Sequence, residues 1–160
     1  MERKTKVQAG DGRQDILITR EFDLPVELLF RAHTEAELFE QWMSHEHGIV
    51  KVQQFNMQNH GGWRFQTSDQ QGNVLFGANG VIHEFVHGQK IVRTFEMENT
   101  PFPVQLEFLD FEALGNDRSK LSIQIVYRSA EWREQMLKLP FAQGLDMAHN
   151  RLEDVMGKIG

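Results

Sequence analysis

The chain has 160 residues, the length of one ordinary domain, with 40% hydrophobic and 25% charged side chains. It contains no cysteine, which excludes disulfides, thiolate metal sites and cysteine nucleophiles. The formal net charge is -6 and the 17 basic residues are scattered along the sequence, so we expect no nucleic-acid partner. No apolar run approaches the roughly 20 residues that span a bilayer, and the polar N-terminus lacks the core of a secretory signal. We therefore expect a cytoplasmic protein without membrane insertion.

Residues 1–14 contain two glycines and mixed charges without hydrophobic periodicity. We expect a flexible lead-in there, followed by a single domain over residues 15–160. From Asp15 to Phe22 apolar and polar side chains alternate, which predicts a half-buried strand. Arg20 interrupts its apolar face, and this position fits either a rim location near the strand end or a cation inside a pocket.

Two short helices are predicted after this strand. Asp23 can accept backbone N–H bonds ahead of the first helix, and Pro25 suits its first turn. Thr34 is the candidate N-cap of the second helix, with Glu37 at capping-box spacing.

Residues 48–127 contain strands separated by turn signals, which favours an antiparallel meander. Apolar residues alternate with polar ones in its last two segments, so we expect each apolar set to face the core. These sets are Val104, Leu106 and Phe108, then Leu121, Ile123, Ile125 and Tyr127.

After Ser129 the hydrophobic period changes from two to about 3.6, which predicts a helix. Pro140 either kinks this helix or opens a new one. The apolar residues beyond it recur at spacings of four and three, as in a helix that lies across a sheet: Phe141, Leu145, Ala148, Leu152, Val155 and Ile159.

Several local motifs resemble those of the bacterial proteins similar to the activator of heat-shock protein 90 ATPase, within the START-like (SRPBCC) helix-grip superfamily. The N-terminal signature is carried by Ile18 to Pro25, and a two-glycine strand entry by Gly61 to Phe65. Further matches are Gly80 to Phe85, Gly144-Leu145 and Arg151 to Glu153. The sequence departs from the family at Met43 to Gly48, where relatives often carry a second Trp and Gly-Pro, and at Ile82, where an aromatic residue is common.

The resemblance implies an α+β helix-grip fold. A curved antiparallel sheet of about six or seven strands would wrap around a long C-terminal helix, with two short helices after the first strand. The superfamily commonly has a cavity between sheet and helix. The predicted apolar faces agree with this, although the same residues could also pack a dry core.

Thirteen residues are candidates for the cavity lining on these grounds: Trp42, Met43, Phe65, Ile82, Arg93, Phe95, Leu106, Phe108, Ile123, Tyr127, Met136, Leu145 and His149. Arg93, Tyr127 and His149 are the candidate polar contacts among them. For Arg93 a protein carboxylate or a rim location is the simpler interpretation, for Tyr127 a backbone carbonyl partner, and for His149 a boundary position.

No motif indicates an enzyme class, so catalytic residues remain unassigned. His45-Glu46-His47 contains metal-ligand types, but no pattern supplies the remaining ligands, so we predict neither a metal site nor a cofactor.

Three functions are compatible with the sequence. The first is binding of a small hydrophobic or amphipathic molecule in the cavity. The second is a protein-interaction module, which requires an exposed apolar patch on the sheet or around Trp63 and Trp132; a chaperone partner rests on analogy alone. The third is a cavity-based cyclase or hydrolase, which requires a buried acid–base pair such as Glu84 with His149. The sequence leaves a homodimer open.

Overall fold

A single antiparallel sheet of eight strands dominates the computed structural model, which describes residues 3–9 and 13–159. The strand order is β1-β2-β8-β7-β6-β5-β4-β3, a meander in which only β2 and β8 pair across a long connection. The strands are β1 (Lys6–Gln8), β2 (Asp15–Phe22), β3 (Ile49–Phe55), β4 (Gly62–Ser68), β5 (Val74–Val86), β6 (Lys90–Met97), β7 (Gln105–Gly115) and β8 (Arg118–Val126).

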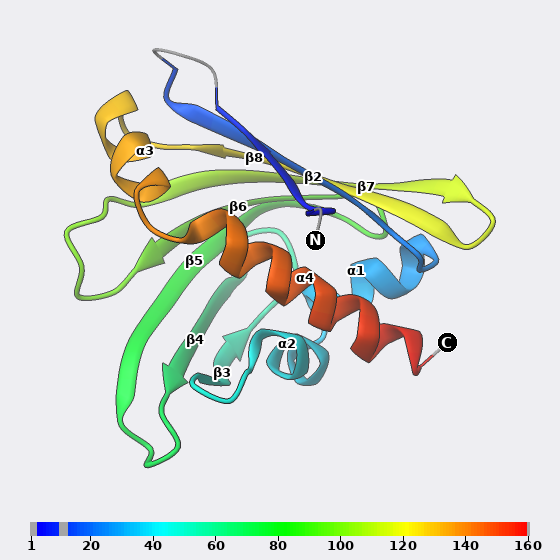
Figure 1. The fold of residues 1–160 in the computed structure, drawn as a ribbon, viewed down its shortest axis with the longest axis horizontal. Helices are drawn as coiled ribbons and strands as arrows, with labels where there is room; N and C mark the ends of the chain where they lie inside the picture. The colour runs from blue at the N-terminus through cyan, green and yellow to red at the C-terminus, as the bar shows by residue number, and fades with distance from the viewer. Residues whose placement is uncertain (1–2, 10–12, 160) are drawn as a thin grey trace.

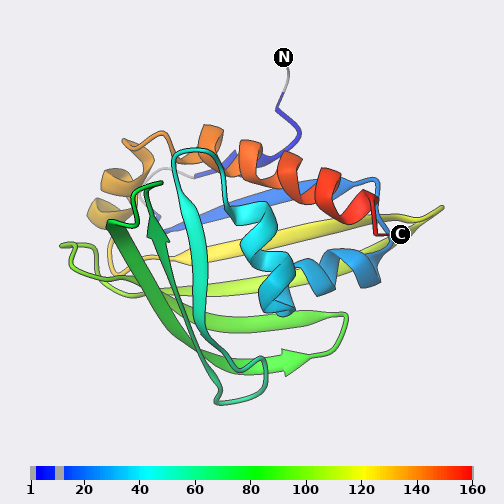
Figure 2. The same ribbon diagram turned by 90° about the horizontal axis from the view of Figure 1, so that it is seen from below.

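Four helices lie on one side of this sheet: α1 (Val26–Thr34), α2 (Ala36–Met43), α3 (Ala130–Leu137) and α4 (Phe141–Gly157). The long helix α4 crosses the concave face (Figure 1), and α1 and α2 close one end beneath it (Figure 2). In the described part of the chain, no helix combines the length and apolar character needed to cross a membrane. The arrangement confirms the predicted helix-grip architecture.

The sheet has more strands than the six or seven predicted because a short one, β1, forms within residues 1–14. Lys6 pairs with Thr19, and Gln8 with Leu17, along the outer edge of β2. A three-residue strand is too short to show periodicity, so the sequence pattern did not indicate it. Residues 1–2 and 10–12 of the expected lead-in lie outside the described residues.

The helix boundaries differ from the expected caps at both short helices. Pro25 is itself the N-cap of α1 and no side chain caps this helix, since the Asp23 carboxylate accepts from Arg118 Nε at 3.0 Å instead. Thr34 is the last residue of α1 rather than the N-cap of α2, and its hydroxyl donates to the Phe30 carbonyl at 3.0 Å. Glu35 is the N-cap of α2 and makes no side-chain capping bond. Pro140 separates α3 from α4, so it opens a new helix instead of kinking one.

The inward face of β7 is opposite to the one predicted. Gln105, Glu107 and Leu109 are buried, whereas Leu106 and Phe108 lie on the outer face and are only half-buried. The sequence of this strand has apolar residues in both alternating phases, so hydrophobicity alone does not decide which phase faces inward. The polar side chains face inward here because Arg93 of β6 lies directly opposite Glu107 and pairs with it.

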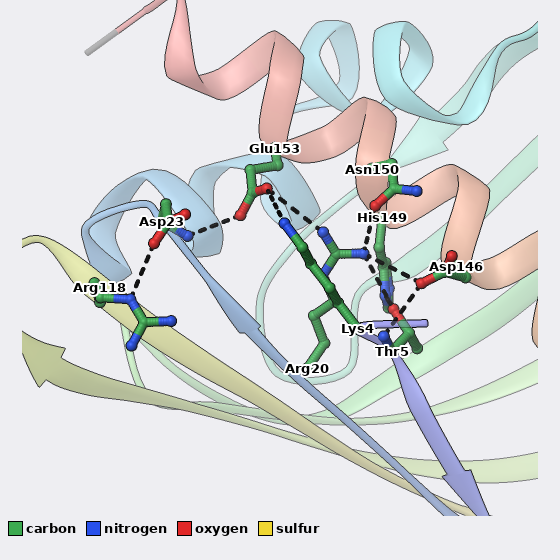
Figure 3. Close-up of polar contacts among 9 residues, drawn as sticks. All are labelled: Lys4, Thr5, Arg20, Asp23, Arg118, Asp146, His149, Asn150 and Glu153. Carbon is green, nitrogen blue, oxygen red and sulfur yellow. Dashed lines mark hydrogen bonds and ion pairs between the residues drawn. The ribbon is translucent and has the colours of Figure 1, made fainter. Parts of the chain in front are cut away.

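A buried cation connects β2 to α4 (Figure 3). The Arg20 side chain is 0% exposed, so the rim location expected for it is wrong. Its Nη1 lies 3.5 Å from Asp146 Oδ1 and 2.8 Å from Asn150 Oδ1, and its Nη2 lies 3.6 Å from Glu153 Oε1. These three partners are spaced i, i+4 and i+7 and therefore lie on one face of α4.

Thr5, just before β1, extends this cluster toward the interior. Its hydroxyl oxygen lies 3.3 Å from Arg20 Nη1 and 3.0 Å from Nδ1 of His149 (Figure 3). The N-terminal segment is thus connected through side chains to both β2 and α4.

Candidate functional site

A pocket of about 280 Å³ lies between the concave face of the sheet and the helices α2 and α4. Its walls are mainly aromatic and aliphatic side chains, as is usual for small-molecule sites, and its volume is just below their usual range of about 300–1,000 Å³. Ten of the thirteen predicted residues line it: Trp42, Met43, Phe65, Arg93, Phe95, Ile123, Tyr127, Met136, Leu145 and His149.

The other three predicted residues lie elsewhere. Ile82 is fully buried in the core but does not line the pocket. It pairs with Arg93 at the point where the pairing of β5 with β6 shifts register. Leu106 and Phe108 point away with the outer face of β7, and Phe108 lines a shallow groove there with Leu17.

Sequence reasoning missed several lining residues, notably His33, Trp63, Gln105 and Glu107. The alternation around Phe65 does place Trp63 on its face, so a signal for this residue was present. The two polar residues of β7 carried no such signal, since polar side chains are expected to face solvent.

Trp63 closes the sheet side of the pocket. It is 1% exposed and stacks on Phe65, with ring centroids 5.8 Å apart. Its indole nitrogen packs over Gly80 of the neighbouring strand, where a Cβ atom would lie 2.5 Å from that nitrogen and 1.9 Å from the Thr94 carbonyl oxygen. Only glycine therefore fits position 80.

A compact polar cluster lies on the sheet side of the pocket. Arg93 Nε donates to Glu107 Oε1 at 2.8 Å, and Gln105 Nε2 donates to Glu107 Oε2 at 2.8 Å. The Arg93 guanidinium also lies over the Trp63 ring, 4.4 Å from its centroid. The pairing with a protein carboxylate agrees with the simpler interpretation of Arg93, and it makes the cluster electrically neutral.

Tyr127 follows β8 beside this cluster. Its hydroxyl is buried and has no hydrogen-bond partner among residues 3–9 and 13–159, so the expected backbone carbonyl partner is not there. Burial and the nearby Glu107 carboxylate both raise the pKa of Tyr127, so the phenol remains protonated and is a hydrogen-bond donor at neutral pH.

Two buried histidines line the helical side. His33 Nδ1 lies 2.9 Å from the Leu29 carbonyl oxygen, and burial lowers the pKa of His33 to about 4. His149 is 1% exposed, which corrects the expected boundary position. Burial lowers the pKa of His149 well below its usual value, and the neighbouring His33 and Arg20 act in the same direction. Both imidazoles are therefore neutral at pH 7.

The family assignment follows from comparison with known sequences. The profile of the family described as Activator of Hsp90 ATPase homolog 1-like protein matches residues 23–157, which is most of the chain. The chain belongs to this family. Curated protein sequences give no significant match.

Solved bacterial structures share the fold of this Activator of Hsp90 ATPase homolog 1-like domain. A protein from Rhodobacter sphaeroides has a TM-score of 0.86 at 17% identity, covering 96% of this chain and 99% of its own. One from Mycobacterium smegmatis has a TM-score of 0.83 at 18% identity, covering 94% and 95%. One from Staphylococcus epidermidis has a TM-score of 0.82 at 19% identity, covering 97% and 95%. Identities this low establish the fold alone.

Residues 43–48, the segment expected to differ from relatives, adjoin the pocket. Met43 lines the pocket, and Ser44 fixes the start of β3 by accepting a hydrogen bond from the Val50 amide at 2.9 Å. The histidines at 45 and 47 are exposed beyond it, and the Nδ1 atom of His45 accepts from the amide of His47. Among the described residues, no three side chains of metal-ligand type gather into a metal site.

The acid–base pair considered for an enzyme in this family is not brought together. Glu84 lies on the outside with its side chain 47% exposed and pairs with Lys90 at 2.6 Å. His149 is enclosed beneath α4 and its Nδ1 contacts Thr5. The two side chains face different environments and share no contact.

Proposed function

We propose that this domain binds a small, mainly apolar molecule in the pocket between the concave face of the sheet and α4. The observation that carries the proposal is the pocket of about 280 Å³ with a largely apolar lining. Protein interiors usually pack densely, with few voids larger than a water molecule. A pocket of this size, lined by bulky side chains and bordered by a few fixed polar groups, has the character of a ligand site.

The two other functions find less support in the geometry. The interaction module needed an exposed apolar patch on the outside of the sheet or around Trp63 and Trp132. Trp63 is buried and Trp132 is half-buried against Phe102. On the outside of the sheet, the groove beside Leu17 and Phe108 is lined mainly by polar side chains. The enzyme needed a buried acid–base pair, for example Glu84 with His149. The Glu84 side chain is 47% exposed, and Glu107, the buried carboxylate of the pocket, accepts bonds from Arg93 and Gln105. Ligand binding requires neither an exposed apolar patch nor an acid–base pair, but only the pocket itself.

The test uses N-phenyl-1-naphthylamine, an apolar dye whose fluorescence rises in apolar surroundings. We expect saturable binding to the wild-type protein, and loss of binding in Phe95→Trp because the larger ring fills part of the pocket. Native mass spectrometry of mildly purified protein, followed by solvent extraction, identifies any molecule that copurifies.

The matched control is Phe108→Trp, which makes the same change on the outer face of β7. It should leave the dye titration unchanged. Equal titrations of wild type and Phe95→Trp would locate the dye outside the pocket and contradict the proposal.

A further inference from the structure

The polar side of the pocket has an uneven supply of hydrogen-bond donors and acceptors. Both oxygens of Glu107 accept bonds, one from Arg93 Nε and one from Gln105 Nε2. The terminal nitrogens of Arg93 make no hydrogen bond to any described residue, and neither does the Tyr127 hydroxyl. The Gln105 amide oxygen also receives no hydrogen bond from a described residue, so this side of the pocket offers more unused donors than acceptors.

These donors lie at one place on the sheet. Arg93 is directly opposite Glu107 across β6 and β7. The register of β7 with β8, in which Leu106 faces Val126, continues to put Gln105 opposite Tyr127. The guanidinium orientation is fixed, because Glu107 holds its Nε edge and Trp63 lies against its face at 4.4 Å. A ligand oxygen would meet a preorganised donor rather than a mobile side chain.

The net charge of this polar cluster determines whether a charged or a neutral ligand oxygen binds better. Arg93 and Glu107 neutralise each other at 2.8 Å, and the two pocket histidines are uncharged at pH 7. A ligand carboxylate would have to lose its hydration next to Glu107 without an unpaired cation to compensate it. A neutral carbonyl or hydroxyl oxygen accepts the same hydrogen bonds without that penalty.

We infer that the pocket takes a neutral, mainly apolar molecule with a carbonyl or hydroxyl oxygen, and that this oxygen accepts hydrogen bonds from the terminal guanidinium nitrogens of Arg93. This inference rests on the proposed function, because it concerns a ligand of the same pocket. Tyr127, beside the same cluster, is a second donor for the same oxygen after a small side-chain adjustment.

Three naphthalenes that differ in one substituent test the inference: 2-acetylnaphthalene, 2-ethylnaphthalene and 2-naphthoate. Each is titrated against bound N-phenyl-1-naphthylamine at pH 7. Because hydrogen bonds to charged groups are the stronger ones, we expect the acetyl compound to bind about tenfold more tightly than the ethyl compound. The naphthoate should bind most weakly.

Two variants assign the preference to Arg93 and Glu107. In Arg93→Met/Glu107→Gln the preference for the acetyl over the ethyl compound should fall well below tenfold, because only the Tyr127 hydroxyl remains of the two donors. In Glu107→Gln alone the Arg93 charge is unbalanced, so the naphthoate should become the tightest ligand. The control is Arg64→Met/Glu98→Gln, which removes an arginine–glutamate pair joined by two hydrogen bonds on the other face of the sheet and should leave all three affinities as in wild type.

The outcomes separate this inference from the proposed function. If neither the dye nor any naphthalene binds, both are overturned. If the dye and both neutral naphthalenes bind but the acetyl and ethyl compounds are equal in wild type, the inference fails and the apolar pocket stands. Tightest binding of 2-naphthoate to the wild type would likewise overturn the neutral-oxygen inference.

Discussion

The imidazoles of His33 and His149 are buried where α1 and α4 meet the pocket. Their protonation affects the stability of the fold as well as the charge of the pocket. When burial disfavours protonation of a histidine in the folded state, low pH shifts the folding equilibrium toward the unfolded chain, in which the histidine can be protonated. Because burial lowers the pKa of His33 to about 4, against an ordinary value of 6.5, the unfolded chain binds more protons than the folded one between these pH values. Stability from this residue is complete above about pH 6.5 and is lost as the pH falls toward 4.

We therefore expect the free energy of unfolding, measured with urea, to fall between about pH 6.5 and 5 by up to about 1.4 kcal/mol per pH unit for each of the two histidines. Carboxylates with lowered pKa values, such as Glu98 at about 2, lose their contribution only at lower pH. His33→Phe should remove about half of the slope because one of the two buried imidazoles is gone. An unchanged slope in this variant would show that other groups cause the pH dependence.

At the scale of the elements, the position of α4 depends on a polar anchor in addition to its apolar face. Arg20 extends from β2 to three side chains on one face of α4, of which Asp146 and Glu153 are negatively charged. Glu153 also accepts a hydrogen bond from the backbone amide of Asp23 at 2.8 Å (Figure 3). The C-terminal half of α4 is thus held to the connection between β2 and α1. The helix forms one wall of the pocket, so its anchor also helps to hold that wall in place.

Removal of the anchor should destabilise the domain. We expect Arg20→Met to lower the free energy of unfolding by about 2–3 kcal/mol, less than for a fully buried pair because the remaining carboxylates are partly exposed. Arg118→Met is the matched control, since Arg118 pairs with Glu21 and Asp23 at the surface and should contribute less than about 1 kcal/mol. Urea unfolding of both variants gives the comparison, and equal losses would mean that burial does not strengthen the Arg20 contacts.

Periodicity in the sequence was sufficient to predict most of these elements. The alternation in β2 and β8 and the apolar spacing of α4 follow directly from packing one face of each element against a shared core. Periodicity failed where it was absent or ambiguous. β1 is too short to have a period, and β7 has apolar residues in both phases, so the inward face was assigned incorrectly at Leu106 and Phe108.

The site was predictable in its apolar part but not in its polar part. Aromatic residues such as Phe65 and Phe95 were identified because they lie on regular inward faces. Glu107 was not identified, because a buried carboxylate is stable only beside a partner such as Arg93, and strand register determines that partnership. Register depends on pairing between distant segments, which a pattern within one strand does not contain.

At the scale of the whole molecule, the fold explains why a pocket exists without determining its ligand. A sheet this curved cannot contact a straight helix along its whole length, so side chains must fill the space between them or leave part of it open (Figure 2). One fold can host many unrelated functions. The chemistry of the lining in this chain is therefore a better guide to its ligand than the family name.

A ligand in this pocket should stabilise the whole domain, because it contacts the sheet and the helices at once and binds only the folded state. At a concentration of N-phenyl-1-naphthylamine ten times its measured dissociation constant, the expected gain is about 1.4 kcal/mol. For a domain of this size that raises the Tm by about 3–6 °C. The shift should be present in wild type and Phe108→Trp and absent in Phe95→Trp, as followed by circular dichroism during heating. A shift of equal size in all three proteins would mean that the dye acts on the surface, since the pocket is altered only in the last.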